Sequence, residues 1–458
     1  MRPQLLTAAL ASGAFAARPF LNEPDIGLEE FLGDIEPGTL PNISAMATLH
    51  DFDFAARNYL PQSNYSWFRH GAGGEWSYRN NLEAFQRYTF KQRALTDITK
   101  VRNSLPTTIL GHNFSAPFYI SPAAQGIRCH PEAESGLVKG AAAGDILYIP
   151  SIYASKTIEE IAAEKAEGQI LFQQLYLDNN DTNTKALLAR SEKAGAAAIV
   201  FTVDAVADGN RPRRRRFESS FNPDEELSLF NWEYYDKLAS LTDLPVVVKG
   251  INSVEDAKLA VEHKVPAIII SNHGGRQVDG VSSAIETALE IHNEAPEVFK
   301  QTEVWADGGV RYGTDVIKLL ALGVKAIGLG RSFMYSNVYG AEGVERAIEI
   351  LKYEIAIDAA NLGISDLKEI NPDWVRWNQN GWSSSISQHE SKPQSLSQPH
   401  QFSQTSVVLY LEVDTDARLL AIIGNLSLAF KVNRYNHGYT AENVVDEPAI
   451  QHKSRGAR

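Results

Sequence analysis

A histidine and an arginine stand three positions apart in the stretch SNHGGRQ, which follows the apolar residues Ala267–Ile270. An imidazole can take a proton from a substrate group. A guanidinium can bind a carboxylate through two parallel hydrogen bonds. His273 and Arg276 together therefore suit chemistry on a small acid. For one such pair alone, a purely structural hydrogen bond is the alternative.

Three further residues strengthen the chemical interpretation. Arg211 and Lys249 add two cations that we expect at the same face of the protein, although the chain carries a formal net charge of −13. Asp204 could hold the histidine ring and stabilise the imidazolium once it forms. A base beside a carboxylate clamp suits attack on a 2-hydroxy acid.

Oxidation at such a carbon needs an electron acceptor, which amino-acid side chains do not provide. The stretches DGGVRYGTD (307–315) and GLGR (328–331) place glycines and arginines where barrels often bind phosphate. No GxGxxG motif follows the first predicted strand. The sequence therefore favours a phosphate-bearing mononucleotide over a dinucleotide.

Eight short β-rich runs alternate with helical patterns such as those at 253–263 and 313–323. This alternation predicts an α/β fold, specifically a closed (β/α)₈ barrel. The runs cover residues 117–121, 146–149, 170–176, 198–204, 245–250, 267–272, 303–309 and 325–331. Polar residues stand where these runs end, and the carboxyl ends of the strands form the active face of such a barrel. They are Ser121, Ser151, Gln174, Tyr176, Thr202, Asp204, Lys249, Ser271, His273, Asp307 and Arg331.

The remaining segments suggest how the chain is organised. Residues 1–16 have the pattern of a signal peptide, with Ala14-Phe15-Ala16 as a cleavage-like site. We therefore expect secretion, with the cytoplasm or an organelle as the alternative. The barrel domain is predicted over 45–378, with 45–116 as a helical flank. Residues 379–458 are expected to be a Ser/Gln-rich, disordered linker and a tail of unknown role, with a β-like run at 407–413.

Composition narrows the partners. The negative charge disfavours nucleic acid, and we expect the run Arg213–Arg216 to be solvated loop charge. Cys129 is the single cysteine, so no internal disulfide and no cysteine metal cluster can form. We predict no bound metal, and no apolar run is long enough to span a membrane.

The stretch SNHGGRQ matches the active-site signature of the FMN-dependent α-hydroxy acid oxidases and dehydrogenases. PAAQG, FQQLY, TVD, PVVVKG, DGGVRYGTDVIKLLALG and GLGR follow the same family order. The chain resembles this family over roughly residues 45–377. The resemblance implies FMN as cofactor, a small 2-hydroxy acid as substrate, and O₂ or another electron acceptor. It also implies a homo-oligomer, commonly a tetramer.

The resemblance also implies individual roles. His273 would be the base, Asp204 would pair with it, and Tyr176 would hydrogen-bond the substrate. Arg276 and Arg211 would bind the substrate carboxylate. The FMN-binding set would be Pro122, Ala123, Ala124, Ser151, Gln174, Thr202, Lys249, Ser271, Asp307, Gly308, Gly309, Val310, Arg311, Gly330 and Arg331.

One position departs from the family pattern. The family has a substrate-binding tyrosine four residues before a glycine, and here Trp67 occupies that position before Gly71. Trp67 is therefore included among the expected substrate-binding residues. The alternative function is an FMN-binding barrel whose hydroxy-acid activity is altered or lost, acting on an unusual acid.

Overall fold

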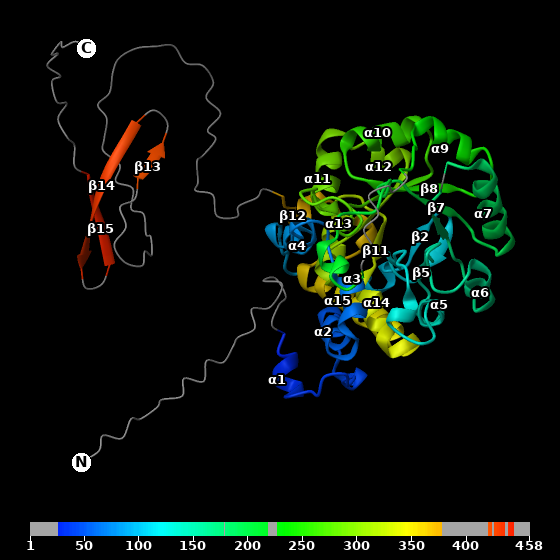
Figure 1. Ribbon diagram of the computed structural model, residues 1–458, viewed down its shortest axis with the longest axis horizontal. Coiled ribbons are helices and arrows are strands. Elements are labelled where there is room, and N and C mark those ends of the chain that lie inside the picture. The colour runs from blue at the N-terminus through cyan, green and yellow to red at the C-terminus, as the bar shows by residue number, and fades with distance from the viewer. Residues whose placement is uncertain are drawn as a thin grey trace, which may run out of the picture. The chain divides into compact units, whose positions relative to one another are not determined.

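Eight short parallel strands form the centre of the larger of two compact units (Figure 1). The computed structural model describes residues 26–177, 179–218 and 227–377 and the residues of three strands near the C-terminus. The barrel strands are β4 (Phe118–Ile120), β5 (Leu147–Tyr148), β6 (Gln173–Leu175), β7 (Ile199–Thr202), β8 (Val246–Ile251), β9 (Ala267–Ile270), β10 (Glu303–Asp307) and β11 (Ala326–Leu329). Seven of them lie within predicted runs, and β8 extends one residue beyond its run, to Ile251.

The eight strands close on themselves. Their order is β5-β4-β11-β10-β9-β8-β7-β6, and every neighbouring pair is parallel. Isolated parallel bridges join Tyr148 to Leu171 and Ser151 to Gln174, and so connect the two ends of this order. The predicted (β/α)₈ architecture is confirmed.

Aromatic side chains fill the interior of the barrel. The Trp305 ring lies 5.9 Å from that of Tyr119 and 6.1 Å from that of Phe172. Ile109 and Phe114 join the same cluster from the hairpin of β2 (Thr107–Ile109) and β3 (His112–Phe114). These apolar side chains pack the amino-terminal end of the barrel. A ligand site must therefore lie toward the carboxyl ends of the strands.

Helices cover the outside of the barrel. The principal ones are α5 (Ser135–Gly144), α6 (Ile158–Ala163), α7 (Asp181–Lys193), α9 (Trp232–Ala239), α10 (Val254–Glu262), α11 (Ala284–Glu294), α13 (Gly313–Ala321) and α15 (Gly340–Leu362). The helices predicted at 253–263 and 313–323 are α10 and α13. The Ser253 hydroxyl accepts a hydrogen bond from the Asp256 amide and so caps α10 at its first turn.

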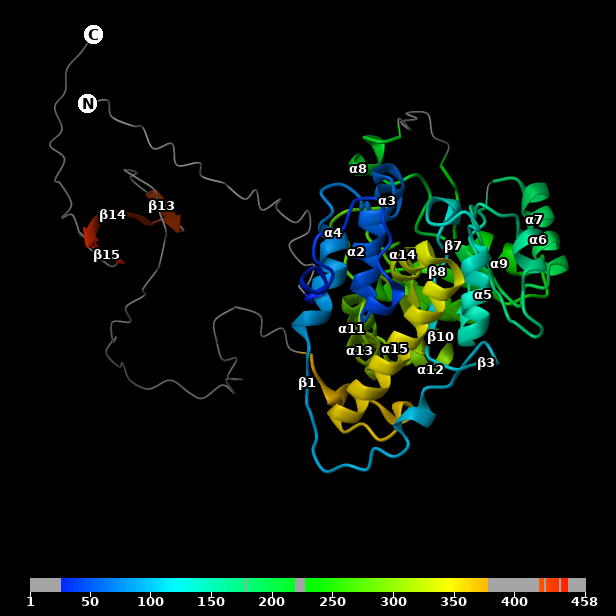
Figure 2. The same ribbon diagram turned by 90° about the horizontal axis from the view of Figure 1, so that it is seen from below.

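Shorter helices connect these elements. They are α8 (Pro212–Arg215), α12 (Val298–Gln301) and α14 (Arg331–Ser336). Figure 2 shows α8 and α3 at one end of the barrel and β3 at the opposite end. The loop that carries α8 follows β7 and so belongs to the carboxyl end of the strands.

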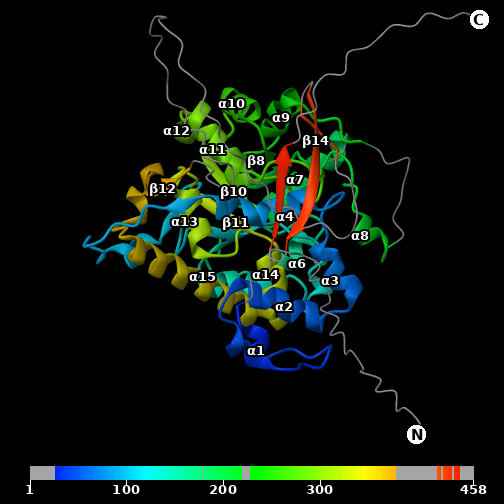
Figure 3. The same ribbon diagram turned by 90° about the vertical axis from the view of Figure 1, so that its left-hand side faces the viewer.

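The N-terminal flank is mainly helical in its first half and forms short strands in its second half. Helices α1 (Leu28–Leu32), α2 (Leu49–Tyr59), α3 (Gln62–Arg69) and α4 (Trp76–Glu83) are followed by β1 (Thr89–Phe90), β2 and β3. Two short 3-10 helices, Ala84–Arg87 and Val101–Ser104, also lie in this segment, so the prediction of a helical flank over 45–116 is wrong where β1, β2 and β3 form. Strand β1 pairs with β12 (Val375–Arg376), a long-range contact that local sequence does not show. Figure 3 shows α2 beside α14.

A second unit comprises residues 384–458. Its described part is an antiparallel sheet of β13 (Leu420–Ile423), β14 (Leu426–Tyr435) and β15 (Gly438–Asn443). The predicted signal peptide (1–16), most of the predicted linker and the β-like run at 407–413 lie outside the described residues.

Candidate active site

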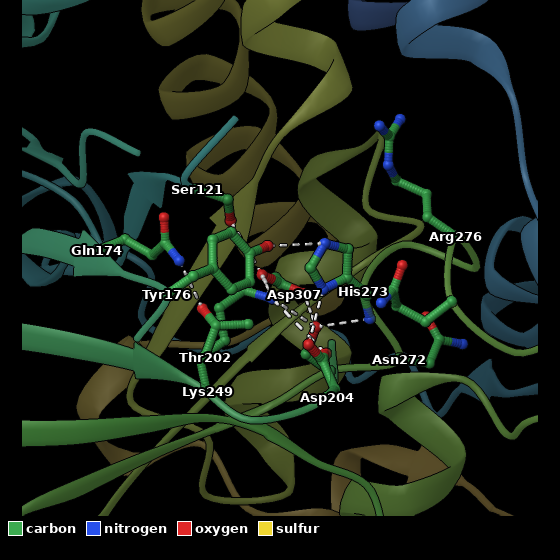
Figure 4. Close-up of polar contacts among 12 residues, drawn as sticks. Ser121, Gln174, Tyr176, Thr202, Asp204, Lys249, Asn272, His273, Arg276 and Asp307 are labelled. Atoms are coloured by element: carbon green, nitrogen blue, oxygen red, sulfur yellow. Dashed lines mark hydrogen bonds and ion pairs between the residues drawn. The ribbon is translucent and has the colours of Figure 1, made fainter. Parts of the chain in front are cut away.

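Buried polar side chains gather at the carboxyl ends of the strands, as the sequence predicts. They are Ser121, Ser151, Gln174, Thr202, Lys249, Ser271 and Asp307. The Gln174 amide donates to the Thr202 hydroxyl (3.0 Å). Asp307 accepts hydrogen bonds from Ser271 (2.6 Å) and Ser121 (3.2 Å) (Figure 4).

Lys249 is the cation at the centre of this group. Its ammonium lies 3.0 Å from the Ser271 hydroxyl, 3.6 Å from Asp307 and 4.0 Å from Asp204. Burial by itself lowers the pKa of Lys249, but the charges of Asp307 and Asp204 outweigh that effect and raise it. Lys249 therefore keeps a positive charge although its side chain is buried.

His273 stands between an acid and a phenol. Its Nδ1 lies 2.7 Å from Asp204 Oδ1, and its Nε2 lies 3.2 Å from the Tyr176 hydroxyl (Figure 4). A carboxylate only accepts hydrogen bonds, so Nδ1 carries the proton and Nε2 is left as the acceptor. The structure thus brings together the three predicted catalytic residues, from segments far apart in the chain.

The charges of this group match that assignment. Burial lowers the pKa of His273, although Asp204 opposes the shift, so the ring is neutral and can accept a proton. Burial alone raises the pKa of Asp204, but His273 and Lys249 outweigh it, so the carboxyl group stays ionised. Burial, followed by the charge of Asp204, raises the pKa of Tyr176, which keeps the phenol protonated.

The backbone around His273 adopts an uncommon conformation. His273, Gly274 and Gly275 have φ angles of 58°, 63° and 71°, in the left-handed region that glycine adopts more easily than other residues. A Cβ atom at Gly275 would lie 2.6 Å from the backbone nitrogen of Tyr78. The two glycines therefore let the loop turn sharply against α4 and direct His273 into the site.

The predicted substrate-binding arginines lie beside the C-terminus of α3. Arg276 donates from one nitrogen to the carbonyl oxygens of Trp67 and Phe68, each at 3.2 Å. Figure 4 shows its guanidinium directed away from the Tyr176–His273 pair. The terminal carbonyls of a helix lack intrahelical partners, so these hydrogen bonds cap α3.

Arg211 and Arg331 complete this cationic region. Arg211 Nε donates to the Arg276 carbonyl oxygen at 2.8 Å. Arg331 donates to the carbonyl oxygens of Phe68 (2.8 Å), His70 (2.8 Å) and Gly274 (2.9 Å). Among the described residues no carboxylate forms an ion pair with Arg276 or Arg331. The region therefore carries excess positive charge and favours an anionic ligand.

The expected phosphate-binding segment follows β10. Gly308 and Gly309 have φ angles of 106° and 87°, and a Cβ atom at Gly309 would lie 1.9 Å from the Asn81 carbonyl oxygen. The Arg311 side chain donates to the Val310 carbonyl oxygen (2.9 Å). At Gly330 an added Cβ would meet only the Ser121 Cβ, at 3.9 Å, so space is open beside this backbone.

The residues present fit FMN. Lys249 offers a buried positive charge, Gln174 and Thr202 offer amide and hydroxyl groups, and Asp307 can accept hydrogen bonds from ribityl hydroxyls. The open space at Gly330 and the cation of Arg311 suit a phosphate group. Pro122, Ala123 and Ala124 are half-buried after β4, and Ser151 follows β5. The Val310 side chain belongs to the hydrophobic core, so Val310 has only its backbone to offer a ligand.

Sequence reasoning did not identify several residues that shape the site. Asn81 and Asn272 exchange two amide hydrogen bonds (2.9 and 2.7 Å) that hold the His273 loop against α4. Arg213 binds Glu75 through two contacts of 2.7 and 2.8 Å. Arg214 lies over Trp67, so the expectation that Arg213–Arg216 is solvated charge is wrong for its first two members. The density of arginine in 211–216 was the available signal.

Comparison with known proteins defines the class. The model of the FMN-dependent dehydrogenase family matches residues 56–230 and 224–377. The chain is 35% identical over 374 residues to L-lactate dehydrogenase (cytochrome) of Wickerhamomyces anomalus, covering 75% of this chain and 65% of the relative. It is 36% identical over 358 residues to the peroxisomal (S)-2-hydroxyacid oxidase GLO3 of Arabidopsis thaliana, covering 72% and 96%.

Solved structures agree. The flavin-binding domain of baker's yeast flavocytochrome b2 superposes with a TM-score of 0.72 and 32% identity, covering 81% of this chain and 96% of that one. A mandelate oxidase variant gives 0.66 and 33%, covering 72% and 98%. The chain therefore belongs to the FMN-dependent dehydrogenase family, whose members are oxidoreductases. It spans about two thirds of the length of the yeast L-lactate dehydrogenases it matches, 65% and 66%.

In the part of the chain that the structure describes, no helix is long and apolar enough to cross a membrane. Within the same residues, no group of three or more His, Cys, Asp or Glu side chains is arranged to hold a metal ion.

Proposed function

We propose that this protein oxidises an L-2-hydroxy acid to the 2-oxo acid with FMN as cofactor, and that residues 45–378 form the catalytic domain. The observation that carries the proposal is the position of His273. Its Nε2 is an acceptor because Nδ1–H donates a hydrogen bond to Asp204 at 2.7 Å, and the side chains around it are polar and cationic.

FMN, when bound, supplies the two-electron acceptor that side chains lack. We assign its binding to Pro122, Ala123, Ala124, Ser151, Gln174, Thr202, Lys249, Ser271, Asp307, Gly308, Gly309, Val310, Arg311, Gly330 and Arg331. Arg331 would join the phosphate contacts by giving up hydrogen bonds to neutral carbonyl oxygens. The buried charge of Lys249 favours the additional negative charge that the site must accept during oxidation.

Oxidation removes two electrons and two protons from the substrate, one proton from the carbon and one from its hydroxyl group; the electrons and the proton that His273 does not accept would leave to the acceptor that bound FMN supplies. His273 Nε2 accepts one of these protons, and Asp204 stabilises the resulting imidazolium. The Tyr176 hydroxyl, 3.2 Å from Nε2, is placed to donate a hydrogen bond to the substrate oxygen instead. Because the Tyr176 phenol stays protonated, it remains a donor throughout.

The substrate carboxylate would be bound by Arg276 and Arg211. In the structure Arg276 donates to two neutral carbonyl oxygens at 3.2 Å. A hydrogen bond to a carboxylate is about twice as strong as one to a neutral acceptor. The exchange of these carbonyl contacts for a bidentate carboxylate contact is therefore favourable and would turn Arg276 toward His273.

The test is the absorbance spectrum of the purified protein under anaerobic conditions. We expect oxidised flavin peaks that bleach on addition of a 2-hydroxy acid from a panel of short, long and aromatic members. His273→Ala should retain the flavin peaks and lose the bleaching. Oxidised flavin that persists with every acid would overturn the proposed activity, and bleaching by the His273→Ala variant would overturn the assignment of the base.

A second candidate is a barrel that binds FMN but has altered or lost hydroxy-acid activity. The observation that favours it is Trp67, which stands where the family has a substrate-binding tyrosine. The same spectrum separates the candidates, since this one predicts flavin peaks without bleaching. The electron acceptor, O₂ or another, is distinguished by adding O₂ to the reduced protein. An assembly into homo-oligomers and a secretory destination also remain proposals from the sequence.

A further inference from the structure

Two arginines stack on the indole of Trp67. The guanidinium carbon of Arg128 lies 4.3 Å from the ring centroid and that of Arg214 lies 4.2 Å from it. Glu218 joins the two cations, with contacts of 2.6 Å to Arg128 and 3.1 Å to Arg214. A guanidinium over an indole face is attracted to it, and the attraction is stronger when the cation is withdrawn from water. Here both cations are at least three-quarters buried, at 23% and 16% side-chain exposure.

This cluster connects three separate segments of the site. Trp67 lies on α3, and Arg128 lies in the loop after β4, close to the proposed flavin-facing residues 122–124. Arg214 lies on α8, in the loop after β7. We call the group Trp67, Arg128, Arg214 and Glu218 the tryptophan cluster. Two cations thus cover the indole of Trp67. This indole lies on α3, the helix whose terminal carbonyl oxygens bind Arg276.

Helix α8 depends on such contacts for its position. It has four residues, too few for a helix to be stable by itself. Arg213 anchors it to Glu75 by two contacts (2.7 and 2.8 Å), and Arg214 anchors it to Trp67. Arg211 is the residue immediately before α8, and its carbonyl oxygen accepts the Arg215 amide (3.2 Å). Any shift of α8 therefore moves Arg211.

We infer that Trp67 is a positioning residue, which holds α8 and through it the carboxylate-binding Arg211, and that it is not itself a substrate ligand. This inference rests on the proposed function. It explains why a tryptophan can replace a tyrosine at this position without loss of the site. The ring face does the work, by stacking with Arg128 and Arg214, and the indole N–H has no part in binding the acid.

The first test compares two substitutions in the FMN-loaded protein. Trp67→Phe keeps an aromatic face and loses the N–H, and Trp67→Leu loses both. We expect Trp67→Leu to raise KM about tenfold with kcat changed by less than about threefold, and Trp67→Phe to stay within about threefold of the wild type. If Trp67→Phe were as impaired as Trp67→Leu, a direct contact of the N–H with substrate would be indicated and the inference overturned.

A double-mutant cycle tests the route through Arg211. If Trp67 acts by placing Arg211, then Trp67→Leu should change KM by less than about twofold in an Arg211→Met background. If the effects of Trp67→Leu and Arg211→Met on KM multiplied in the double variant, Trp67 would act independently of Arg211 and the inference would be overturned. Arg216→Met is the matched control, because Arg216 belongs to the same run of arginines but is exposed. It should leave KM unchanged.

Amide hydrogen exchange gives a readout that does not need turnover. In the FMN-loaded protein, Trp67→Leu and Arg214→Met should both accelerate exchange in residues 205–217, whereas Trp67→Phe and Arg216→Met should not. Unchanged exchange in both of the first two variants would overturn the positioning role. The same experiment separates this inference from the proposed function. If the two variants exchange faster but no 2-hydroxy acid reduces the flavin of the wild-type protein, the proposed function is rejected and the role of Trp67 in holding α8 is supported.

Discussion

Replacement of Asp204 by asparagine should slow flavin reduction strongly without removing the cofactor. Asp204 Oδ1 lies 2.7 Å from His273 Nδ1, and its charge stabilises the imidazolium that forms when Nε2 takes a proton. Two unit charges about 4 Å apart attract by about 4 kcal/mol at an effective dielectric constant of about 20. Asparagine can still accept the hydrogen bond, so we expect a loss of about 2–4 kcal/mol. This corresponds to a reduction rate lower by about 30- to 1,000-fold.

The assay is anaerobic rapid mixing with the best substrate, followed by the decrease in flavin absorbance. Asp236→Asn is the matched control, because Asp236 forms a second Asp–His pair, with His263 Nδ1 at 2.9 Å, on the outside of the barrel. It should leave the reduction rate unchanged. Wild-type reduction by Asp204→Asn would refute the electrostatic role, and equal losses in both variants would show that the effect arises from stability.

Four other substitutions test the geometry. Arg276→Lys should raise KM about tenfold or more and slow reduction, because an ammonium cannot form the two-pronged contact; steady-state kinetics with unchanged constants would contradict the proposed carboxylate contact. Gly250→Ala should abolish activity, because its φ is +116° and an added Cβ would lie 2.6 Å from the Asp204 Cβ. Gly280→Ala, at φ +90° with nothing within 4 Å, should cost only about 1 kcal/mol of stability, as thermal unfolding and activity would show. Burial and then the neighbouring carboxylates raise the pKa of Glu354 from 4.5 to about 7, so the folded state favours its protonated form. Stability should therefore fall by about 3 kcal/mol as the pH rises from below 4.5 to above 7. Glu354→Gln, whose amide oxygen can still accept the Gly313 N–H, should remove this loss; parallel melting-temperature profiles of variant and wild type between pH 4 and 8.5 would refute the assignment.

The barrel could be predicted from the sequence because the patterns that indicate its strands and helices each lie within a short segment. Each strand is an apolar run of β-formers, and each helix shows the 3.6-residue spacing of a buried face, so both can be recognised within a short window. Short segments of the sequence did not predict the strands that follow α4. Strand β1 forms only because Arg376 and Val375 lie opposite Thr89 and Phe90, and no pattern within residues 84–116 encodes that contact.

The candidate site was predictable to the level of residue types. The polar residues at the strand ends, and SNHGGRQ in particular, identified which side chains would meet. Sequence did not show that Asp204 Oδ1 would lie 2.7 Å from His273 Nδ1, which leaves Nε2 as the acceptor. It also did not show that Arg276 and Arg331 would donate to the last carbonyl oxygens of α3.

By itself, then, the sequence determined the number and order of the strands, the chemical groups at their ends and the resemblance to an FMN-dependent family. The tertiary structure alone decided how the arginines are used. Arg213 and Arg214 belong to one run with Arg216, yet the first two bind Glu75 and Trp67 while Arg216 is exposed. The reason is physical: a guanidinium is directed by the acceptors and rings that surround it, and Glu75 and Trp67 come from segments more than a hundred residues away.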